Sequence, residues 1–370
     1  MTHIAMVIPT IEEIGGAERQ LLLLAKELSA RGWQVTVVAL SGAAGASANE
    51  LAAANVGYLS LEMRKAWIDP RGWRRYLAWA ARSKPDIVHD HLPHATWFAR
   101  CVRLLAPVRV LVDTLHTSDP GTPALQRAYR LTNRLTNRIT CVSTSVASAA
   151  GAAGIAPREN LTILLNGVAI PCLPSRRPRS SGSPFRWLAV GRLARVKDYP
   201  TLLRAFAALP GQPTLQIAGS GPEEESLRKL AAELNLQNRV EFAGFHRDIQ
   251  PLLANADAFV LSSLWEGLPI SVLEAAAHGL PAVVTDGPGT RETIQPGTTG
   301  LIVPVGDAAA LARAMAEVMA MPPDQRDQMG VNARQFVEAN FALSQIVDRW
   351  EQLYTQLLRM HLHPSRRGLG

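Results

Sequence analysis

Two glutamates, Glu266 and Glu274, lie eight positions apart around the Gly-Leu-Pro turn at residues 267–269. Proline suits the start of a helix and glycine suits its end, so Pro269 and Gly279 predict a short helix that contains Glu274. Carboxylates accept hydrogen bonds from hydroxyl groups, and the unpaired N–H groups at a helix N-terminus attract phosphate. The stretch could therefore bind a ligand that carries both groups. The alternative is that the helix glutamate is an ordinary surface charge.

The 3.6-residue period of this helix predicts two stripes of side chains. They are a polar stripe of Ser271, Glu274 and His278 and an apolar stripe of Ile270, Leu273 and Ala277. We expect Ile270 and Leu273 to face a sheet and Glu274 to face a ligand-binding cleft.

Two basic residues, Arg192 and Lys197, follow the apolar stretch RWLAVG at 186–191. A guanidinium group can bind two phosphate oxygens at once, and a lysine ammonium supplies a compact second charge. The alternative is a solvated basic loop. Their position after a predicted strand favours a phosphate site, because open parallel sheets bind ligands beyond the carboxyl ends of their strands.

A glycine pair, Gly15-Gly16, separates the apolar segment 4–8 from a helical pattern that begins directly after it. Glycine permits close approach of a ligand to the backbone, and the helix N-terminus that follows attracts anions. The dinucleotide-binding pattern GxGxxG is absent. A tight turn without a ligand is the alternative.

Short apolar segments alternate with helical patterns along the chain, which predicts parallel sheets covered on both faces. The pattern occurs twice. The expected fold is therefore α/β, with two doubly wound, Rossmann-like parallel-sheet domains that face a cleft. The predicted strands are 4–8, 34–40, 86–90, 109–115, 138–143, 161–166, 186–191, 214–219, 239–244, 257–263, 281–286 and 300–305.

The domain boundary is predicted in a segment rich in Pro, Ser and Arg, at 171–184, which has the composition of a linker. A length of 370 residues suits two domains. We place the first domain at 1–170 and the second at 185–342. The helical segment 343–370 is expected to pack back on the first domain.

Composition narrows the class of protein. The three cysteines give neither a disulfide framework nor metal-ligand spacing, which indicates a reducing cytosol. The first residues lack the basic start of a signal peptide, and no apolar run is long enough to span a membrane. Residues 1–175 hold 18 Lys/Arg against 12 Asp/Glu, hence +6 of the net +7. This excess either meets an anionic partner or reflects chance drift in composition.

Five motifs in this order resemble the retaining glycosyltransferases of family 4, which have the GT-B fold, and the resemblance covers nearly the whole chain. The paired glutamates match the family's E-x7-E motif, and VGRL followed by Lys197 matches its phosphate site. The other matching segments are GGAE at 15–18, NGV at 166–168 and AGSGPEEESL at 218–227.

The resemblance implies roles for the second domain. Arg192 and Lys197 would hold the diphosphate of a nucleotide-sugar donor, and Glu266 would bind hydroxyls of the transferred sugar. Glu274 would bind the ribose. The backbone around Phe242–Phe245, including Gly244, would line the base. The backbone amides of residues 268–271 would assist Glu266; these residues are Leu268, Pro269, Ile270 and Ser271.

The first domain has implied roles as well. Gly15 and Gly16 would approach the donor phosphate, and His116 would lie near the reacting carbon and act in catalysis with Arg192, Lys197 and Glu266. The resemblance implies same-face attack by an acceptor hydroxyl, with a donor phosphate oxygen taking the proton. The donor is a co-substrate, UDP- or GDP-linked, and no cofactor is expected.

Two features test this resemblance. Asp198 stands where the family commonly has glycine after the lysine, and we expect its side chain to turn outward or cap the following helix. His89, His91 and His94 form a cluster that could suggest a metal site. Without nearby cysteines such histidines more often line a cleft or the surface, and we predict no metal.

The segment 63–84 holds seven Lys/Arg, one Asp and three Trp. This mixture fits a helix lying on an anionic membrane, whereas packing of Trp73 and Leu77 on a sheet would make it an ordinary core helix. The basic surface fits a glycan or lipid-linked acceptor. The expected location is the cytoplasm, with the inner face of the membrane as a peripheral site.

The favoured function is transfer of a sugar during synthesis of bacterial cell-surface glycans such as lipopolysaccharide, capsule or exopolysaccharide. The alternatives are an epimerase or hydrolase of the same fold, or a catalytically silent protein that binds glycans or membranes. The GGAE loop and the glutamate spacing argue against the first, and the intact Arg192, Lys197, Glu266 and Glu274 argue against the second. A nucleic-acid partner is not expected, because the basic residues are not interleaved along one face.

Overall fold

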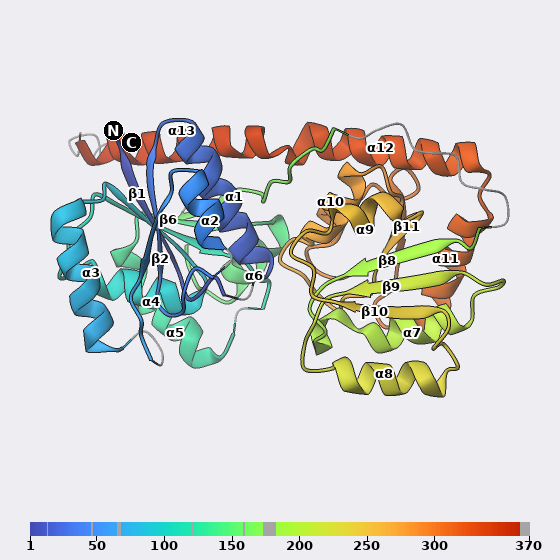
Figure 1. Ribbon diagram of the computed structural model, residues 1–370. Helices are drawn as coiled ribbons and strands as arrows, with labels where there is room; N and C mark the ends of the chain where they lie inside the picture. The colour runs from blue at the N-terminus through green and yellow to red at the C-terminus, as the bar shows by residue number, and fades with distance from the viewer. Residues whose placement is uncertain are drawn as a thin grey trace. The chain divides into compact units, whose positions relative to one another are not determined.

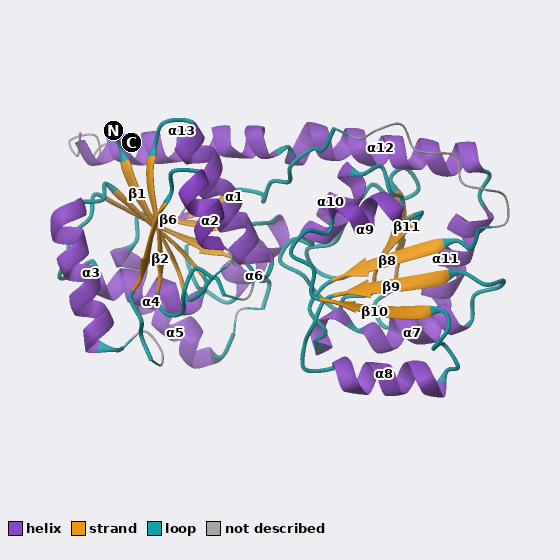
Figure 2. Ribbon diagram, viewed as in Figure 1, coloured by secondary structure: helices purple, strands orange, loops and turns teal. Residues whose placement is uncertain are grey.

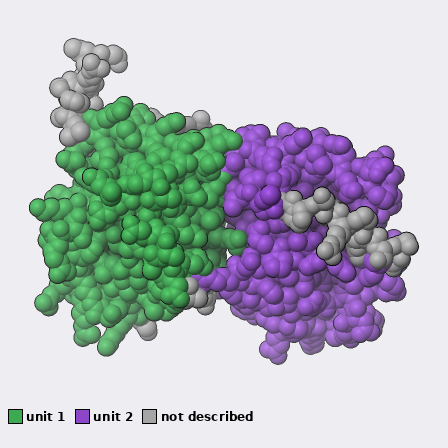
Figure 3. Space-filling view, turned by 45° about the horizontal axis from the view of Figure 1, so that its top comes forward, with its two compact units in different colours: residues 1–167, 343–370 green, residues 168–342 purple. Residues whose placement is uncertain are grey.

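The computed structural model describes residues 1–12, 14–45, 47–64, 68–119, 121–157, 160–172 and 183–362. The chain divides into two compact units, coloured separately in Figure 3. Unit 1 comprises residues 1–167 and 343–370, and unit 2 comprises residues 168–342. Most of the predicted linker, residues 173–182, lies outside the described residues.

Unit 1 contains a parallel sheet of seven strands in the order β3-β2-β1-β4-β5-β6-β7. Figure 1 labels β1, β2 and β6 of this sheet together with helices that cover it. Its strands are β1 His3–Ile8, β2 Gln34–Ala39, β3 Gly57–Ser60, β4 Ile87–His91, β5 Val110–Leu115, β6 Arg138–Cys141 and β7 Leu161–Ile163. Its helices are α1 Gly16–Ala30, α2 Ser47–Ala53, α3 Pro70–Ser83, α4 Pro93–Val102, α5 Pro123–Thr132, α6 Thr144–Ala152 and α13 Leu343–Leu362, with a 3-10 turn at Asn133–Leu135.

Alternate residues of the central strand β1 face two separate cores, as expected for a sheet covered on both sides. Ile4, Met6 and Ile8 pack in one cluster with side chains of α1 and α13. Ala5 and Val7 pack in another with side chains of α3 and α4. Because α13 buries Val347, Trp350 and Tyr354 among others in the first cluster, the end of the chain is a structural part of unit 1.

Unit 2 repeats the pattern with six parallel strands in the order β10-β9-β8-β11-β12-β13. Figure 2 shows β8, β9 and β10 side by side. Its strands are β8 Arg186–Val190, β9 Thr214–Ala218, β10 Val240–Gly244, β11 Ala258–Leu261, β12 Ala282–Thr285 and β13 Gly300–Val303. Its helices are α7 Tyr199–Ala207, α8 Glu224–Glu233, α9 Gln250–Asn255, α10 Ile270–Ala277, α11 Ala308–Ala320 and α12 Pro323–Phe341, with 3-10 turns η3 Arg195–Lys197 and η4 Arg291–Thr293.

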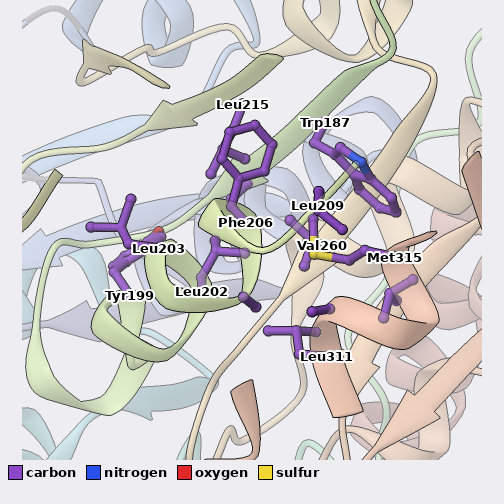
Figure 4. Close-up of a cluster of buried hydrophobic side chains, with 14 of the residues drawn as sticks. Trp187, Tyr199, Leu202, Leu203, Phe206, Leu209, Leu215, Val260, Leu311 and Met315 are labelled. Atoms are coloured by element: carbon purple, nitrogen blue, oxygen red, sulfur yellow. The ribbon is translucent and has the colours of Figure 1, made fainter. Parts of the chain in front are cut away.

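The larger core of unit 2 lies between the sheet and the helices α7, α8 and α11. Figure 4 shows Trp187 of β8, Phe206 of α7 and Met315 of α11 within it. Leu188 points to the other face, where it joins residues of α9 and α10. The alternation of Trp187 and Leu188 places helices on both faces, so the predicted doubly wound fold is confirmed.

Most predicted strands are present with ends that differ by one to three residues. The strand predicted at 161–166 is shorter, ending at Ile163. The strand β3 was not predicted. Its sequence GYLS lies at the edge of the sheet and is only partly buried, so it has no continuous apolar run to reveal it.

Candidate active site

Lys197 and Glu266 form an ion pair in unit 2. The Lys197 Nζ lies 2.6 Å from Glu266 Oε1, and the two side chains are 17% and 13% exposed. Ser263 Oγ donates a second hydrogen bond, also of 2.6 Å, to the same oxygen. The structure thus brings together two residues that the sequence analysis placed on different groups of one ligand, the diphosphate and the sugar.

The loops that carry this pair are held together at the carboxyl ends of neighbouring strands. Ser262, just beyond β11, donates from Oγ to the Lys197 carbonyl at 2.7 Å. Thr285, the last residue of β12, donates from Oγ1 to the Ser263 carbonyl at 2.6 Å. The Glu266 N–H donates to the carbonyl of Pro288 at 2.9 Å. These hydrogen bonds therefore fix the ion pair at the carboxyl ends of the strands, where the sequence predicted ligand binding.

Glycines allow this close packing of loops. A Cβ at Gly191 would lie 2.9 Å from Cε of Lys197, and one at Gly289 would lie 2.4 Å from the carbonyl oxygen of Glu266. Gly289 also has a φ of +82°, which favours glycine. Tyr199 donates its hydroxyl to the Gly191 carbonyl at 3.0 Å. Burial, reinforced by the charge of Glu266, raises the pKa of Tyr199, so the hydroxyl keeps the proton that it donates.

Arg192 differs from Lys197 in its surroundings. It lies in the same loop after β8, but its residue is exposed, and its guanidinium has no hydrogen bond or ion pair to the part of the chain that the structure describes. An exposed guanidinium in the loop that also carries Lys197 can bind an anionic ligand without first breaking a contact with the protein.

Helix α10 is buried nearly all round, which corrects the predicted division into two stripes. Seven of its eight residues are buried, Glu274 among them at 8% exposure. Val272 and Ala275 pack in the cluster with β11 and β12, rather than Ile270 and Leu273. Most residues of the helix are apolar, so nearly all of its surface is buried, and Glu274 is buried with it.

The N-terminus of α10 corrects a second prediction. Pro269 is the N-cap rather than the first helical residue, and it has no N–H to donate. The amide donors predicted for residues 268–271 are therefore those of Leu268, Ile270 and Ser271. Gly279 follows the helix with a φ of +68°, as its predicted role at the helix end requires.

Gly244 ends the edge strand β10 with a φ of +74°. Its carbonyl accepts a hydrogen bond of 2.7 Å from the N–H of Gly219, which follows β9. Phe245, next in the chain, is 56% exposed. The segment predicted to line a base thus lies at the carboxyl ends of β9 and β10. The ion pair also lies at the carboxyl ends of strands of this sheet.

In unit 1, Gly15 is the N-cap of α1, and its N–H donates to Glu18 Oε2 at 3.0 Å. Gly16 is the first helical residue, and a Cβ built there would meet nothing within 4 Å. The protein itself therefore does not require glycine at position 16. The reason predicted for a glycine at position 16 is close approach of a ligand to the backbone, and this stays a prediction.

His116 follows β5 and contacts a histidine of the neighbouring strand, since its Nε2 lies 2.9 Å from Nδ1 of His91. Burial lowers the pKa of His116 to about 4. It lines a small cavity of about 40 Å³ together with Leu115, Thr117 and Tyr129 among others. The ring is therefore neutral at neutral pH and adjoins a space of one or two water molecules in size.

The predicted histidine cluster is kept only in part, since the rings of His89 and His91 lie 4.1 Å apart. His89 and His91 point into unit 1 and are 0% and 2% exposed, which corrects their expected place at a surface or cleft, whereas His94 on α4 is exposed. Burial lowers the pKa of His89 to about 3 and that of His91 well below its usual value. Among the described residues, no group of three or more His, Cys, Asp and Glu side chains could hold a metal ion.

Two family models match the chain. The one described as "Glycosyltransferase Family 4" matches residues 14–170, and the one described as "Glycosyl transferases group 1" matches residues 175–336. Together they span both units. The chain belongs to glycosyltransferase family 4.

Curated relatives and solved structures agree with this membership. The lipopolysaccharide core biosynthesis glycosyltransferase LpsE of Rhizobium meliloti is 36% identical over 45% of this chain and 48% of its own length. WcaL of Escherichia coli, named for colanic acid biosynthesis, is 30% identical over 52% and 50%. The matched part of the chain thus spans about half the length of these relatives. The structure of Anabaena HepE with UDP-glucose superimposes with a TM-score of 0.83 at 22% identity, covering 96% of this chain and all of that one.

Membership of family 4 explains the conformation of Asp198. Its φ of +45° and ψ of +46° are left-handed, which glycine adopts without cost and aspartate tolerates better than most residues. The glycine common in the family suits this turn. Asp198 occupies the N-cap position of α7, but its side chain makes no capping hydrogen bond. Of the two places expected for this side chain, the cap is therefore absent, and the outward orientation stays a prediction.

The sequence analysis missed a buried ion pair between Arg100 and Asp113 in unit 1. Arg100 of α4 pairs with Asp113 of β5 at 2.6 Å, and both side chains are fully buried. Asp90 lies opposite Asp113 in the β4–β5 register. Burial and the neighbouring Asp113 raise the pKa of Asp90 well above its usual value. Polar residues at matching positions of DIVHD and VLVDTL were the signal that could have revealed this cluster.

No helix in the described ranges is both long and apolar enough to cross a membrane.

Proposed function

We propose that this family 4 enzyme is a retaining glycosyltransferase that moves a sugar from a nucleotide-diphosphate donor to an acceptor hydroxyl during synthesis of a bacterial cell-surface glycan. The observation that carries the proposal is the Lys197–Glu266 pair at the carboxyl ends of β8 and β11, with exposed Arg192 beside it. Support for the donor comes from HepE, whose solved complex contains UDP-glucose. Support for the pathway comes from the names of LpsE and WcaL.

The leaving group of this reaction is a nucleoside diphosphate, whose negative charge grows as the glycosidic bond breaks. Fixed positive groups near that charge stabilise the transition state more than the ground state. Lys197 is held by its contact with Glu266 and by the bond from Ser262 to its carbonyl. Arg192 adds a mobile guanidinium suited to two phosphate oxygens. We assign both residues to the diphosphate.

The same ion pair suits the junction between diphosphate and sugar. Glu266 is anchored at Oε1 by Lys197 and Ser263, so its carboxylate is fixed without being buried completely. A fixed carboxylate selects hydroxyl groups at a defined distance from the phosphate. We assign Glu266 to the transferred sugar and Glu274 to the ribose.

The proposed chemistry is attack by the acceptor hydroxyl on the same face of the sugar that the diphosphate leaves. The anomeric carbon passes through an oxocarbenium-like state, and an oxygen of the departing phosphate takes the acceptor proton. Arg192 and Lys197 supply the positive charge that a metal ion would otherwise provide. We therefore propose that the reaction needs neither a cofactor nor a divalent metal.

An anionic membrane is the proposed place of the acceptor, but the structure narrows the surface that could touch it. Trp73 and Trp79 of α3 pack against the core of unit 1, so they behave as core residues. Arg75 pairs with Glu62 at 2.7 Å. The exposed cations of this helix that carry the membrane proposal are Arg71, Arg74 and Arg82.

A donor screen tests the proposal. The protein is incubated with UDP- and GDP-linked sugars and a simple alcohol as acceptor, with and without excess chelator. Mass spectrometry follows release of the nucleoside diphosphate and formation of the glycoside. Transfer that survives chelation, with the donor's anomeric configuration kept in the product by NMR, is the expected result. An inverted product would refute the retaining mechanism, loss of activity restored by one metal would refute metal independence, and inactivity with every donor would refute the transferase.

A further inference from the structure

A chain of hydrogen bonds across the middle of the unit 1 sheet fixes where protons lie. Thr140 Oγ1 donates to the Asp113 carbonyl at 3.2 Å and lies 2.6 Å from Thr114 Oγ1. A hydroxyl has one proton, so Thr140 must accept in the second contact and Thr114 must donate. Thr114 Oγ1 also lies 2.6 Å from His89 Nε2. Because its proton is already committed, Thr114 accepts there.

His89 therefore carries its proton on Nε2. Burial keeps its pKa at about 3, so the ring is neutral and Nδ1 has no proton. Tyr354 of α13 completes the chain, since its hydroxyl lies 2.7 Å from this Nδ1 and donates to it. All four contacts are satisfied by this single assignment.

His91 lies two residues further along β4, and its ring is 4.1 Å from that of His89. Its Nδ1 is 2.9 Å from His116 Nε2, while its own Nε2 is buried and has no partner in the described residues. A proton on that Nε2 would be a buried donor without an acceptor, which proteins avoid more strictly than an unused acceptor. The proton of neutral His91 is therefore on Nδ1, in the bond to His116.

We propose that His91 is a positioning residue that donates from Nδ1 to Nε2 of His116, so that neutral His116 presents its Nδ1–H as a hydrogen-bond donor. This inference rests on the proposed function and on the place near the reacting carbon that the family resemblance implies for His116. The inference specifies the direction of the hydrogen bond that His116 makes. In this tautomer the Nδ1–H group can donate a hydrogen bond to an oxygen of the nucleotide-sugar or of the acceptor, whereas Nε2 is occupied and cannot remove a proton.

His89 and Tyr354 support His91 by packing and by charge. Two neutral rings can lie 4.1 Å apart, whereas protonation of both His89 and His91 would place two cations at this distance and they would repel each other. Tyr354 belongs to α13, so this helix helps to set the tautomer of His89, whose ring lies against that of His91. His116 is thereby held by a buried neutral array rather than by solvent.

Long-range 1H–15N NMR of the full chain, labelled at histidine, reads these tautomers without any substrate. The expected spectrum at pH 7 shows His89 protonated on Nε2 and both His91 and His116 protonated on Nδ1. Signals are assigned with His89→Gln, His91→Asn and His116→Gln. A proton on Nε2 of His116, or a cationic His116 at pH 7, would overturn the inference whether or not the protein transfers sugar.

Kinetics of two His91 variants give the second readout. Asn can place an amide donor near the position of Nδ1, and Leu cannot. We expect His91→Leu to lower kcat about 10–100-fold with little change in donor KM, because misplacing a group at the reacting centre slows the chemical step. His91→Asn should keep kcat within about threefold of wild type, and so should His94→Leu, the exposed control. A folded His91→Leu variant with normal kcat, in a protein that does transfer sugar, would refute the positioning role and leave the proposed function standing.

Discussion

The polar residues of unit 1 and those of unit 2 are arranged in opposite ways. Unit 1 holds two buried histidines, His89 and His91, whose pKa values burial lowers so that both are neutral at pH 7, and an aspartate, Asp90, whose pKa burial raises well above its usual value. Its buried charges, Arg100 and Asp113, neutralise each other. Unit 2 presents a partly exposed ion pair with Arg192 exposed beside it. This difference supports the proposal that unit 2 binds a charged group directly, whereas unit 1 orders neutral hydrogen-bonding groups.

The largest expected effect comes from the buried pair of unit 1. Arg100→Ala would leave Asp113 as a buried charge without its partner, which typically costs about 3–5 kcal/mol of stability. Hydrogen exchange of the β4 and β5 amides should show the loss. The control is Arg228→Ala, which removes an exposed pair with Glu224 and should cost at most about 1 kcal/mol. Equal protection of β4 and β5 in the two variants would mean that the buried charges are not structural.

The ion pair of unit 2 should behave in the opposite way. Arg192→Ala or Lys197→Ala should reduce transfer about 10²–10³-fold, the usual loss for one preorganised donor at a developing charge, while the fold is kept. Steady-state rates together with thermal unfolding of each variant provide the check. Arg195→Ala, an exposed cation of the same turn, is the matched control and should keep near-normal rates. Near-wild-type rates in folded Lys197→Ala would remove it from the diphosphate site.

The neutral histidines should make unit 1 sensitive to acid. His89 has a folded pKa of about 3, against about 6.5 when unfolded, so the unfolded chain binds the extra proton between these values. Its contribution to stability is present above about pH 6.5 and falls by about 1.4 kcal/mol per pH unit below it. Denaturant unfolding of wild type and His89→Gln from pH 7 to 4 should show a shallower slope in the variant. The raised pKa of Asp90 makes the folded protein more stable as the pH falls, which is opposite to the effect of His89. Asp90 is present in both the wild type and the variant, so it does not account for a difference between their slopes. Identical slopes would contradict a neutral buried His89.

The smallest effect is expected on the surface of α3. Reversing Arg71, Arg74 and Arg82 to Glu should weaken binding to acidic vesicles while leaving slow donor hydrolysis intact, because these residues are exposed and unit 2 holds the proposed diphosphate site. Salt should weaken wild-type binding, since charges are screened over about 8–10 Å at physiological ionic strength. Reversing Arg204, Lys229 and Arg313 of unit 2 supplies a control of equal charge. Vesicle binding that both triple variants share equally with wild type would remove α3 from the membrane proposal.

The sequence was sufficient to predict the two sheets, because near-continuous apolar strands such as β1 and β11 repeat between helices. The sequence also singled out Lys197 and Glu266, but it could not show that their side chains touch. The two residues are 69 positions apart, and they meet because their loops follow neighbouring strands of the sheet. The stripes predicted for α10 failed because a helix of mostly small and apolar residues has no preferred face. His91 was not recognised as a partner of His116 because that contact depends on the β4–β5 register. Arg100 was not recognised as a partner of Asp113 because that contact depends on the packing of α4 on β5.

Calorimetric titration of nucleotides tests the central claim, that the charged groups of unit 2 bind a nucleoside diphosphate, most directly. UDP and GDP are titrated into the wild-type protein in excess chelator, and UMP and GMP serve as matched monophosphates. We predict that at least one diphosphate binds more tightly than its monophosphate, and that Lys197→Ala and Arg192→Ala remove this difference whereas Arg195→Ala does not. Equal binding of diphosphate and monophosphate by the wild-type protein, or a difference that persists in both alanine variants, would contradict it.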